Sequence, residues 1–133
     1  MRRGFTLIEL ITVIIIIAVL AAIAFPQYAR VIERSQGSQA KAGLDMIRKA
    51  EAIYYTMNSS YGSITNIATE TPEVSKLGNA DWSYGVSSSA SAFTGSAVRQ
   101  KGIYATAAIV IDKDGVVSVN QGSASSSPAS LWQ

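Results

Sequence analysis

The chain of 133 residues contains neither cysteine nor histidine, and only 15% of its residues are charged. Without cysteine there is no disulfide framework, no thiol nucleophile and no cysteine metal site. Without histidine the chain lacks the usual general base, the commonest metal ligand and any Ser-His-Asp triad. The Asp, Glu and Lys residues show no convergent spacing typical of acid–base chemistry. We therefore expect a protein that is not an enzyme and that holds no cofactor and no metal.

Excess positive charge is found only at the N-terminus. Arg2 and Arg3 account for the formal net charge of +2, because the rest of the chain carries nine basic and nine acidic residues. Nucleic-acid-binding proteins normally present a basic patch or stripe. A neutral body has no such feature, so the charge does not support DNA as a partner.

A long apolar run follows these arginines. It covers the twenty-one residues from Phe5 to Phe25, with Glu9 as its only charge. About twenty helical residues span a hydrocarbon core of roughly 30 Å. Positive charge is retained on the cytoplasmic side, which predicts a single membrane span with an exported C-terminal domain. A carboxylate at membrane depth is costly and is usually functional, so Glu9 needs an explanation.

Two fates of this run follow from its composition alone. A permanent membrane anchor fits the length and leaves Glu9 unexplained. A secretory signal cut after Ala24 would fit the small-x-small pattern Ala22-Ile23-Ala24 and would release a soluble binding protein or small enzyme. The length of the run and the acid inside it argue against that signal.

The letters RRGFTLIEL resemble the processing motif of type IV pilins and pseudopilins, and the short basic leader and Phe5 resemble the type IVa class. The resemblance implies that residues 1–4 are a leader peptide and that a prepilin peptidase cuts after Gly4. The new N-terminal residue, Phe5, is then methylated. Residues 5–26 would form a transmembrane and filament-core helix, and residues 27–133 the second half of the helix with a globular α+β domain.

On the same resemblance, Glu9 pairs with the ammonium group of Phe5 on a neighbouring subunit. Two charges that are each costly in a low-dielectric environment stabilise one another when they are paired. Such a pair would also set the axial register of the filament. Pairing within one subunit is an alternative, and a polar residue tolerated near the membrane interface is another.

The resemblance also implies partners and a location. The precursor would lie in the bacterial inner membrane and meet an assembly platform there. It would then polymerise with copies of itself into an extracellular pilus that serves adhesion, twitching motility or DNA uptake. A type II secretion pseudopilin is the alternative within the filament class, and the short variable region favours a pilus.

The predicted helix continues past the membrane segment. Pro26 should kink or loosen it, and the resemblance implies partial unwinding of Ala18–Pro26 in the filament. We expect one helix from Phe5 to about Met57. Residues 33–39 are polar and show no core face, and Gly37 and Gly43 should let this section flex.

An apolar face on the second half of this helix recurs at steps of three or four residues. Its members are Ala40, Leu44, Ile47, Ala50, Tyr54 and Met57. The charged residues fall off this face, including Glu51. This half of the helix should therefore pack on the rest of the domain.

The remaining sequence predicts a small antiparallel sheet of three or four strands. Residues 64–76 should form a helical turn before Pro72 and then a loop. Strands are expected at residues 81–89, 101–112 and 116–120, the last two joined by a tight turn at Asp112–Gly115 rather than by a calcium loop. The Ser-rich tail should be loosely held, with Leu131 and Trp132 docking back. The fold class is α+β.

Overall fold

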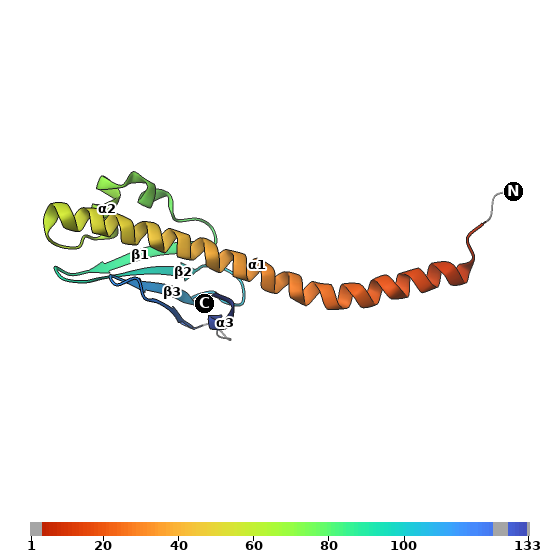
Figure 1. Ribbon diagram of the computed structural model, residues 1–133. Coiled ribbons are helices and arrows are strands. Elements are labelled where there is room, and N and C mark those ends of the chain that lie inside the picture. Colours follow the sequence, from red (N-terminus) through yellow and green to blue (C-terminus); the bar gives the residue numbers. More distant parts are fainter. Residues whose placement is uncertain (1–3, 124–127, 133) are drawn as a thin grey trace. The chain divides into compact units, whose positions relative to one another are not determined.

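The computed structural model describes residues 4–123 and 128–132 (Figure 1). The chain divides into two compact units, one up to Glu33 and one from Arg34 onward. The described part of the first unit is helical from Leu7 onward, and the second unit contains the sheet and the hydrophobic core.

The longest element is the helix α1, Leu7–Asn58. The single helix predicted from Phe5 to about Met57 is thereby confirmed to within two residues at each end. The helical assignment continues through Pro26, although proline has no N–H to donate to the carbonyl four residues earlier. A bend at Pro26, and unwinding of Ala18–Pro26 in a filament, stay predictions.

Four strands form one antiparallel sheet in the order β1-β2-β3-β4 (Figure 1). Their bounds are Trp82–Ser88 for β1, Phe93–Arg99 for β2, Ala108–Asp112 for β3 and Val117–Asn120 for β4. The sequence pattern predicts β1, β3 and β4 but does not reveal β2. The strand expected from residue 101 begins later, because Gly102 and Thr106 take left-handed φ values of 83° and 71° and turn the chain.

Two short helices precede the sheet, namely α2, Ile64–Glu70, and the 3₁₀ helix η1, Pro72–Lys76. Ser63 caps α2, because its side chain accepts a hydrogen bond from the Asn66 backbone N–H. The helical turn predicted before Pro72 is confirmed. The loop predicted after it is wrong, since the fixed φ and missing N–H of proline suit the first turn of a helix.

The tight turn predicted at Asp112–Gly115 is confirmed, and it joins β3 to β4 as a hairpin. The Asp112 carboxylate accepts hydrogen bonds from the backbone N–H groups of Asp114 at 3.0 Å and Val116 at 2.8 Å. Gly115 takes the left-handed φ of 84° that the turn requires. The carboxylate therefore orders the turn from within.

The chain closes with α3, Ala129–Trp132. Trp132 is buried and Leu131 is half-buried against the core, so the predicted docking of both residues is confirmed. The loose part predicted for the tail falls mainly on residues 124–127 and 133, which lie outside the described residues.

The core of the second unit lies between the C-terminal part of α1 and one face of the sheet (Figure 1). The four apolar positions predicted first on this helix face are all buried, namely Ala40, Leu44, Ile47 and Ala50. Burying one such leucine or isoleucine contributes about 1.5–3 kcal/mol. Gly95 of β2 lies under this helix face, where a Cβ would be in ordinary contact with Ile47 and Leu44 and would be tight only against Ile111 Cγ2, at 3.1 Å.

Two residues of α1 depart from the predicted face. Met57 is 66% exposed and Glu51 is fully buried. The six predicted positions are spaced by about 3.4 residues on average, which is less than the 3.6 residues of a helical turn. From Ala40 to Met57, five spacings later, the direction of the side chain therefore shifts by about 100° around the helix. Glu51 lies eleven residues after Ala40 and returns to within about 20° of its direction. Helical geometry thus places the acid on the buried face and Met57 off it.

The environment of Glu51 favours its protonated form. Its Oε2 accepts a hydrogen bond from the Gly62 backbone N–H at 3.0 Å, and its Oε1 has no hydrogen-bond partner among the described residues. Desolvation raises the pKa of this carboxyl group, and the hydrogen bond from Gly62 offsets that rise only in part.

The polar stretch before this face does carry a core contact, contrary to prediction. Gly37 is buried beneath Trp132, and a Cβ at this position would lie only 2.5 Å from Trp132 Cδ1. Gly43 is buried beneath Tyr84 in the same way, at 2.6 Å from the ring. Both glycines therefore serve close packing, where sequence reasoning assigned them flexibility.

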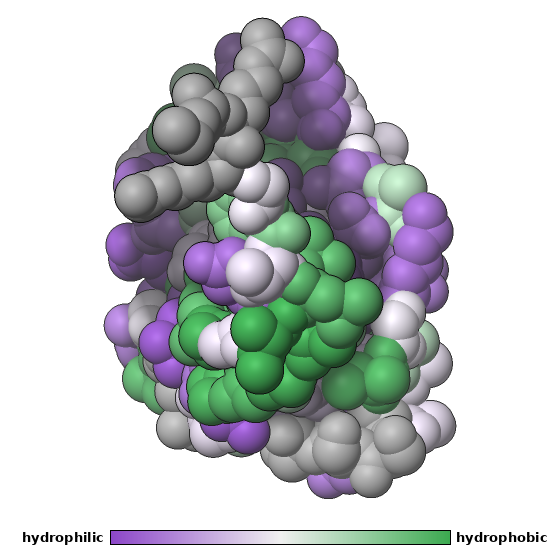
Figure 2. All heavy atoms as spheres, turned by 90° about the vertical axis from the view of Figure 1, so that its right-hand side faces the viewer, coloured by the Kyte–Doolittle hydropathy of each residue, from purple (hydrophilic) through white to green (hydrophobic). Residues whose placement is uncertain are grey.

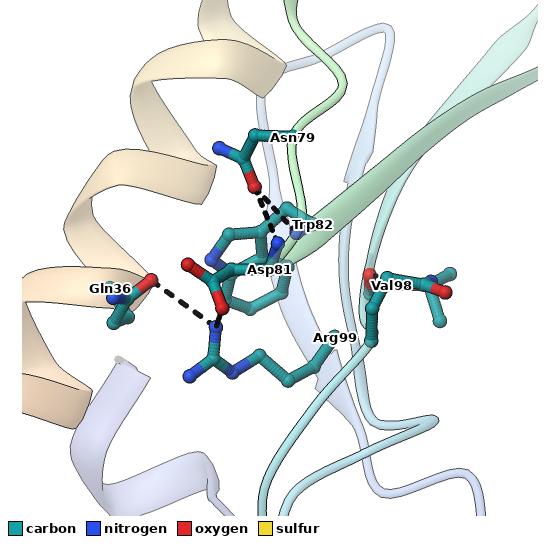
Figure 3. A network of polar contacts seen from close by, with 7 residues as sticks. Gln36, Asn79, Asp81, Trp82, Val98 and Arg99 are labelled. Carbon is teal, nitrogen blue, oxygen red and sulfur yellow. Dashed lines mark hydrogen bonds and ion pairs between the residues drawn. The ribbon is translucent and has the colours of Figure 1, made fainter.

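Aromatic rings and one arginine surround this contact. The Trp132 ring lies 5.0 Å from the Trp82 ring and 5.6 Å from the Tyr104 ring, centroid to centroid. The guanidinium group of Arg99 lies 5.5 Å from the Trp82 centroid and donates a hydrogen bond to Gln36 Oε1 at 3.2 Å (Figure 3). Gln36 belongs to α1 and Arg99 to β2, so the cluster ties the helix, the sheet and the C-terminus together.

We predict that Glu51 makes stability fall as the pH rises. The folded state holds the proton more tightly than the unfolded chain, so its advantage is complete below the unfolded pKa and is lost as the pH rises through the higher pKa of the folded state. In a fragment of residues 34–133, Glu51→Gln should remove this pH dependence. Urea unfolding between pH 4 and 8 measures it. The surface variant Glu73→Gln is the control and should keep the wild-type profile.

We further predict that Gly37→Ala destabilises the same fragment by about 1–3 kcal/mol, because the new methyl group meets the indole of Trp132. In a Trp132→Ala background the same change should stabilise it by up to about 1 kcal/mol, since alanine is the better helix former. Denaturant unfolding of the four proteins gives the comparison. An equal cost of Gly37→Ala in both backgrounds would contradict the contact.

Candidate functional site

The residues before α1 lie outside regular secondary structure. Gly4, Phe5 and Thr6 precede the first helical residue, Leu7, and all three are exposed. A Cβ added at Gly4 would meet no atom within 4 Å, and Phe5 is 84% exposed. The bond between Gly4 and Phe5 is therefore held by no packing among the described residues.

Thr6 and Glu9 form a capping box at the start of α1. The Thr6 backbone N–H and hydroxyl each donate a hydrogen bond of 2.8 Å to Glu9 Oε2, and the Glu9 N–H donates to Thr6 Oγ1 at 3.3 Å. This reciprocal pattern satisfies N–H groups that a helix start leaves unpaired. The signal for it, Thr-x-x-Glu, stands in the sequence, and the pilin-based interpretation of Glu9 passed over it.

The capping box uses only one carboxylate oxygen of Glu9. Among the described residues no hydrogen bond reaches the other oxygen, Oε1. A negative charge at the first turn is also favoured by the helix dipole. Glu9 therefore has a local structural role and retains an oxygen that can accept from another group.

Residues 5–25 of the first unit are apolar on nearly all sides, with Glu9 as the one charged residue. Its large hydrophobic residues between Phe5 and Phe25 are all exposed, from 41% at Ile11 to 84% at Phe5. Figure 2 shows hydrophobic side chains gathered over this segment. The hydroxyl of Thr12 donates to the Ile8 carbonyl at 2.8 Å, so even this polar interruption is satisfied within the helix. By length and composition, α1 could cross a membrane.

Three of the residues predicted from the sequence, Gly4, Phe5 and Glu9, lie together at the start of α1. The capping box adds Thr6 to this group. Pro26 lies seventeen residues after Glu9, about 25 Å further along the helix. It belongs to the same unit and has no contact with the capping box. Among the described residues no group of three or more acidic, His or Cys side chains is arranged to hold a metal ion.

Comparison with known protein families matches residues 1–25 to the family described as "Prokaryotic N-terminal methylation motif". The match covers Gly4, Phe5 and Glu9. It ends one residue before Pro26.

Several curated proteins are similar to the chain. The type IV major pilin protein PilA of Myxococcus xanthus is 39% identical over 72 residues, which cover 54% of this chain and 33% of that protein. The type IV major fimbrial protein FimA of Dichelobacter nodosus is 50% identical over 50 residues, covering 38% and 32%. A fimbrial protein of Pseudomonas aeruginosa is 45% identical over 49 residues, covering 37% and 32%.

The matched part thus spans about a third of the length of these relatives. No solved structure matches the chain. By its N-terminal methylation motif and by the pilins and fimbrial proteins to which it is similar, the chain resembles type IV pilins.

Proposed function

We propose that the chain is the structural subunit of an extracellular type IV pilus and that it polymerises through its N-terminal helix. The observation that carries this proposal is the apolar surface of residues 5–25, which is exposed on every side of the helix. A helix that is apolar all round is stable only inside a membrane or inside an assembly of protein. A pilin occupies both places in turn, first as a precursor in the inner membrane and then in the filament.

Processing is the first step. A prepilin peptidase removes residues 1–4 by cutting after Gly4, and the new N-terminus at Phe5 is methylated. The irregular, exposed backbone from Gly4 to Thr6 supports this step, because a bond outside the helix can enter a protease site without unwinding a turn. Residues 5–26 then form the filament-core helix, and residues 27–133 complete the helix and form the globular domain.

Assembly is the second step, and it takes place at an inner-membrane platform. The apolar helix moves from lipid into a bundle of helices of other subunits, so the burial of its side chains changes little. Specificity then depends on close packing and on polar contacts between helices, as for membrane helices generally. Glu9 supplies the polar contact, because its Oε1 can accept from the ammonium group of Phe5 on a neighbouring subunit.

The pilus interpretation is favoured over a type II secretion pseudopilin by the names of the relatives, which are major pilins and fimbrial proteins. Adhesion and twitching motility are the roles we assign to the filament. DNA uptake is a further role of such filaments, and the neutral body of this chain gives it no electrostatic support. The protein acts as a structural subunit and carries out no chemistry of its own.

We predict that the protein recovered from the cell surface begins at Phe5 and is heavier than the unmodified mature chain by one methyl group. Intact-mass analysis with N-terminal sequencing measures both. Gly4→Val should block the cut, because a side chain at this position obstructs the peptidase, and the precursor should then remain in the membrane. A chain that begins at Phe25 would show instead that a signal peptidase cuts after Ala24.

We predict that the charge of Glu9 is needed for assembly beyond its role in the capping box. Glu9→Gln keeps an oxygen that accepts from the Thr6 N–H and removes the charge. Thr6→Val removes the hydroxyl from the box and keeps the charge. If Glu9 pairs with an ammonium group, Glu9→Gln should yield as few filaments as Glu9→Val, while Thr6→Val should yield nearly the wild-type amount.

Filament yield is measured on sheared cell-surface material and normalised to the processed subunit in the membrane. All three variants should still insert into the membrane and should still be cut after Gly4. The opposite order, with normal yield from Glu9→Gln and poor yield from Thr6→Val, would assign Glu9 to helix capping alone.

A further inference from the structure

A hollow of about 570 Å³ lies in the second unit between the short helices and the outer edge of the sheet. Its walls come from α2, from η1 and the residues that follow it, and from the first half of β1. Ligand pockets in proteins are usually about 300–1,000 Å³ and combine apolar walls with a few convergent polar groups. The filament-forming helix contributes none of the lining residues.

One wall is the free edge of β1, which pairs with β2 alone. Two hydrogen bonds show which residues of β1 bond to β2. The Gln100 N–H donates to the Asp81 carbonyl, and the Ser89 N–H donates to the Ala92 carbonyl, so odd-numbered residues of β1 face β2. Because bonded and non-bonded pairs alternate in antiparallel strands, the N–H and C=O of Trp82 and Tyr84 point outward from the sheet.

Asn79 closes this edge at Trp82. Its side-chain Oδ1 accepts hydrogen bonds from the backbone N–H groups of Asp81 and Trp82, both at 2.8 Å (Figure 3). Its backbone N–H donates to the Trp82 carbonyl at 3.1 Å. These bonds fix the side-chain amide and leave its NH₂ group without a partner among the described residues. Within the hollow, only the outward backbone N–H and C=O of Tyr84 remain without a partner among the described residues.

The polar side chains of the lining are neutral, and only some of them are engaged. The Ser75 hydroxyl donates a hydrogen bond to the Pro72 carbonyl at 2.7 Å. No hydrogen bond among the described residues engages the side-chain hydroxyls of Thr65 and Ser83 or the NH₂ of Asn79. Burial raises the pKa of the Tyr84 phenol, so it stays an uncharged donor and acceptor. No Asp, Glu, Lys or Arg lines the hollow.

Apolar side chains fill the spaces between these polar groups. They come from Ile64, Ala68 and Val74. A sugar presents hydroxyl groups around its ring edge and C–H groups on its ring faces, so it needs neutral donors and acceptors beside apolar surface. A charged ligand would be desolvated here without an opposite charge to compensate it.

We propose that this hollow is a binding site for a short neutral saccharide. The Asn79 amide and the Thr65 and Ser83 hydroxyls meet the sugar hydroxyls, and the apolar wall of α2 and η1 meets a ring face. The site lies within the globular domain, so it does not depend on the proposed polymerisation.

The test uses the full chain in detergent on a printed array of neutral, sialylated and sulfated oligosaccharides, followed by titration with the best neutral ligand. Ser83→Trp places a large ring at the hollow. Ser87→Trp is its matched control: residues 83 and 87 are four positions apart and so lie on the same face of β1, but Ser87 does not line the hollow. Thr65→Val removes one hydroxyl at nearly constant volume.

We expect binding to neutral oligosaccharides, weakened about tenfold or more by Ser83→Trp and less by Thr65→Val. Ser87→Trp should bind like the wild type. Binding confined to sialylated or sulfated ligands, equal binding by both tryptophan variants, or the absence of any neutral ligand would overturn the proposal. Filament yield of Ser83→Trp, measured separately, reports on the proposed function and should be unchanged.

Discussion

The structure depends on one constraint, namely that a single helix must suit two surroundings. Residues 7–25 of α1 are apolar on nearly every side, and the part after Gln39 buries one apolar stripe against the rest of its domain. A helix of the first kind belongs in lipid or in a bundle, and a helix of the second kind belongs on a water-soluble domain. The core of the second unit is therefore closed by one stripe of α1, whereas the large hydrophobic side chains of residues 5–25 are exposed.

A small domain of this kind must hold its C-terminus without a disulfide, since the chain has no cysteine. Trp132 takes that role by packing on Gly37 of α1 and against Trp82 of β1. Buried aromatic side chains carry large apolar areas and gain from edge-to-face contact with one another. The contact works only because position 37 lacks a side chain, so a glycine that weakens the isolated helix permits the packing that fixes it to the domain.

The sequence was sufficient for the features that depend on periodicity and on turn chemistry. It predicted the long helix, three of the four strands, the Asp112 turn and the docking of Trp132. It did not reveal β2, because the inward positions of that strand are Phe93, Gly95, Ala97 and Arg99, and glycine, alanine and arginine hide the alternation.

Burial at two further positions could be read only from the structure. Glu51 faces the core because the angle of an α-helix brings it there, while its charge argues for the opposite face. From the sequence, Gly37 looks like a residue that only weakens the helix. Its contribution to packing depends on Trp132, ninety-five residues later, and local sequence does not show that contact. The sequence identified Gly4, Phe5 and Glu9 through the resemblance to pilins, and that same resemblance concealed the simpler capping box of Thr6 and Glu9.

The capping box and the proposed inter-subunit charge pair are compatible, because the box engages only Oε2 of Glu9 and leaves Oε1 for the proposed pair. In the precursor, Thr6 donates twice to Oε2, so a carboxylate near the membrane is partly satisfied before any neighbour is present. Hydrogen bonds of this kind reduce the cost of burying a charge, though they do not remove it. Cleavage after Gly4 would then add an ammonium group one residue before Thr6. Under the proposed processing, the leader peptide would do more than address the chain. While it remained attached, Phe5 would carry no ammonium group for Glu9 to pair with, and the subunit would not yet be ready to assemble.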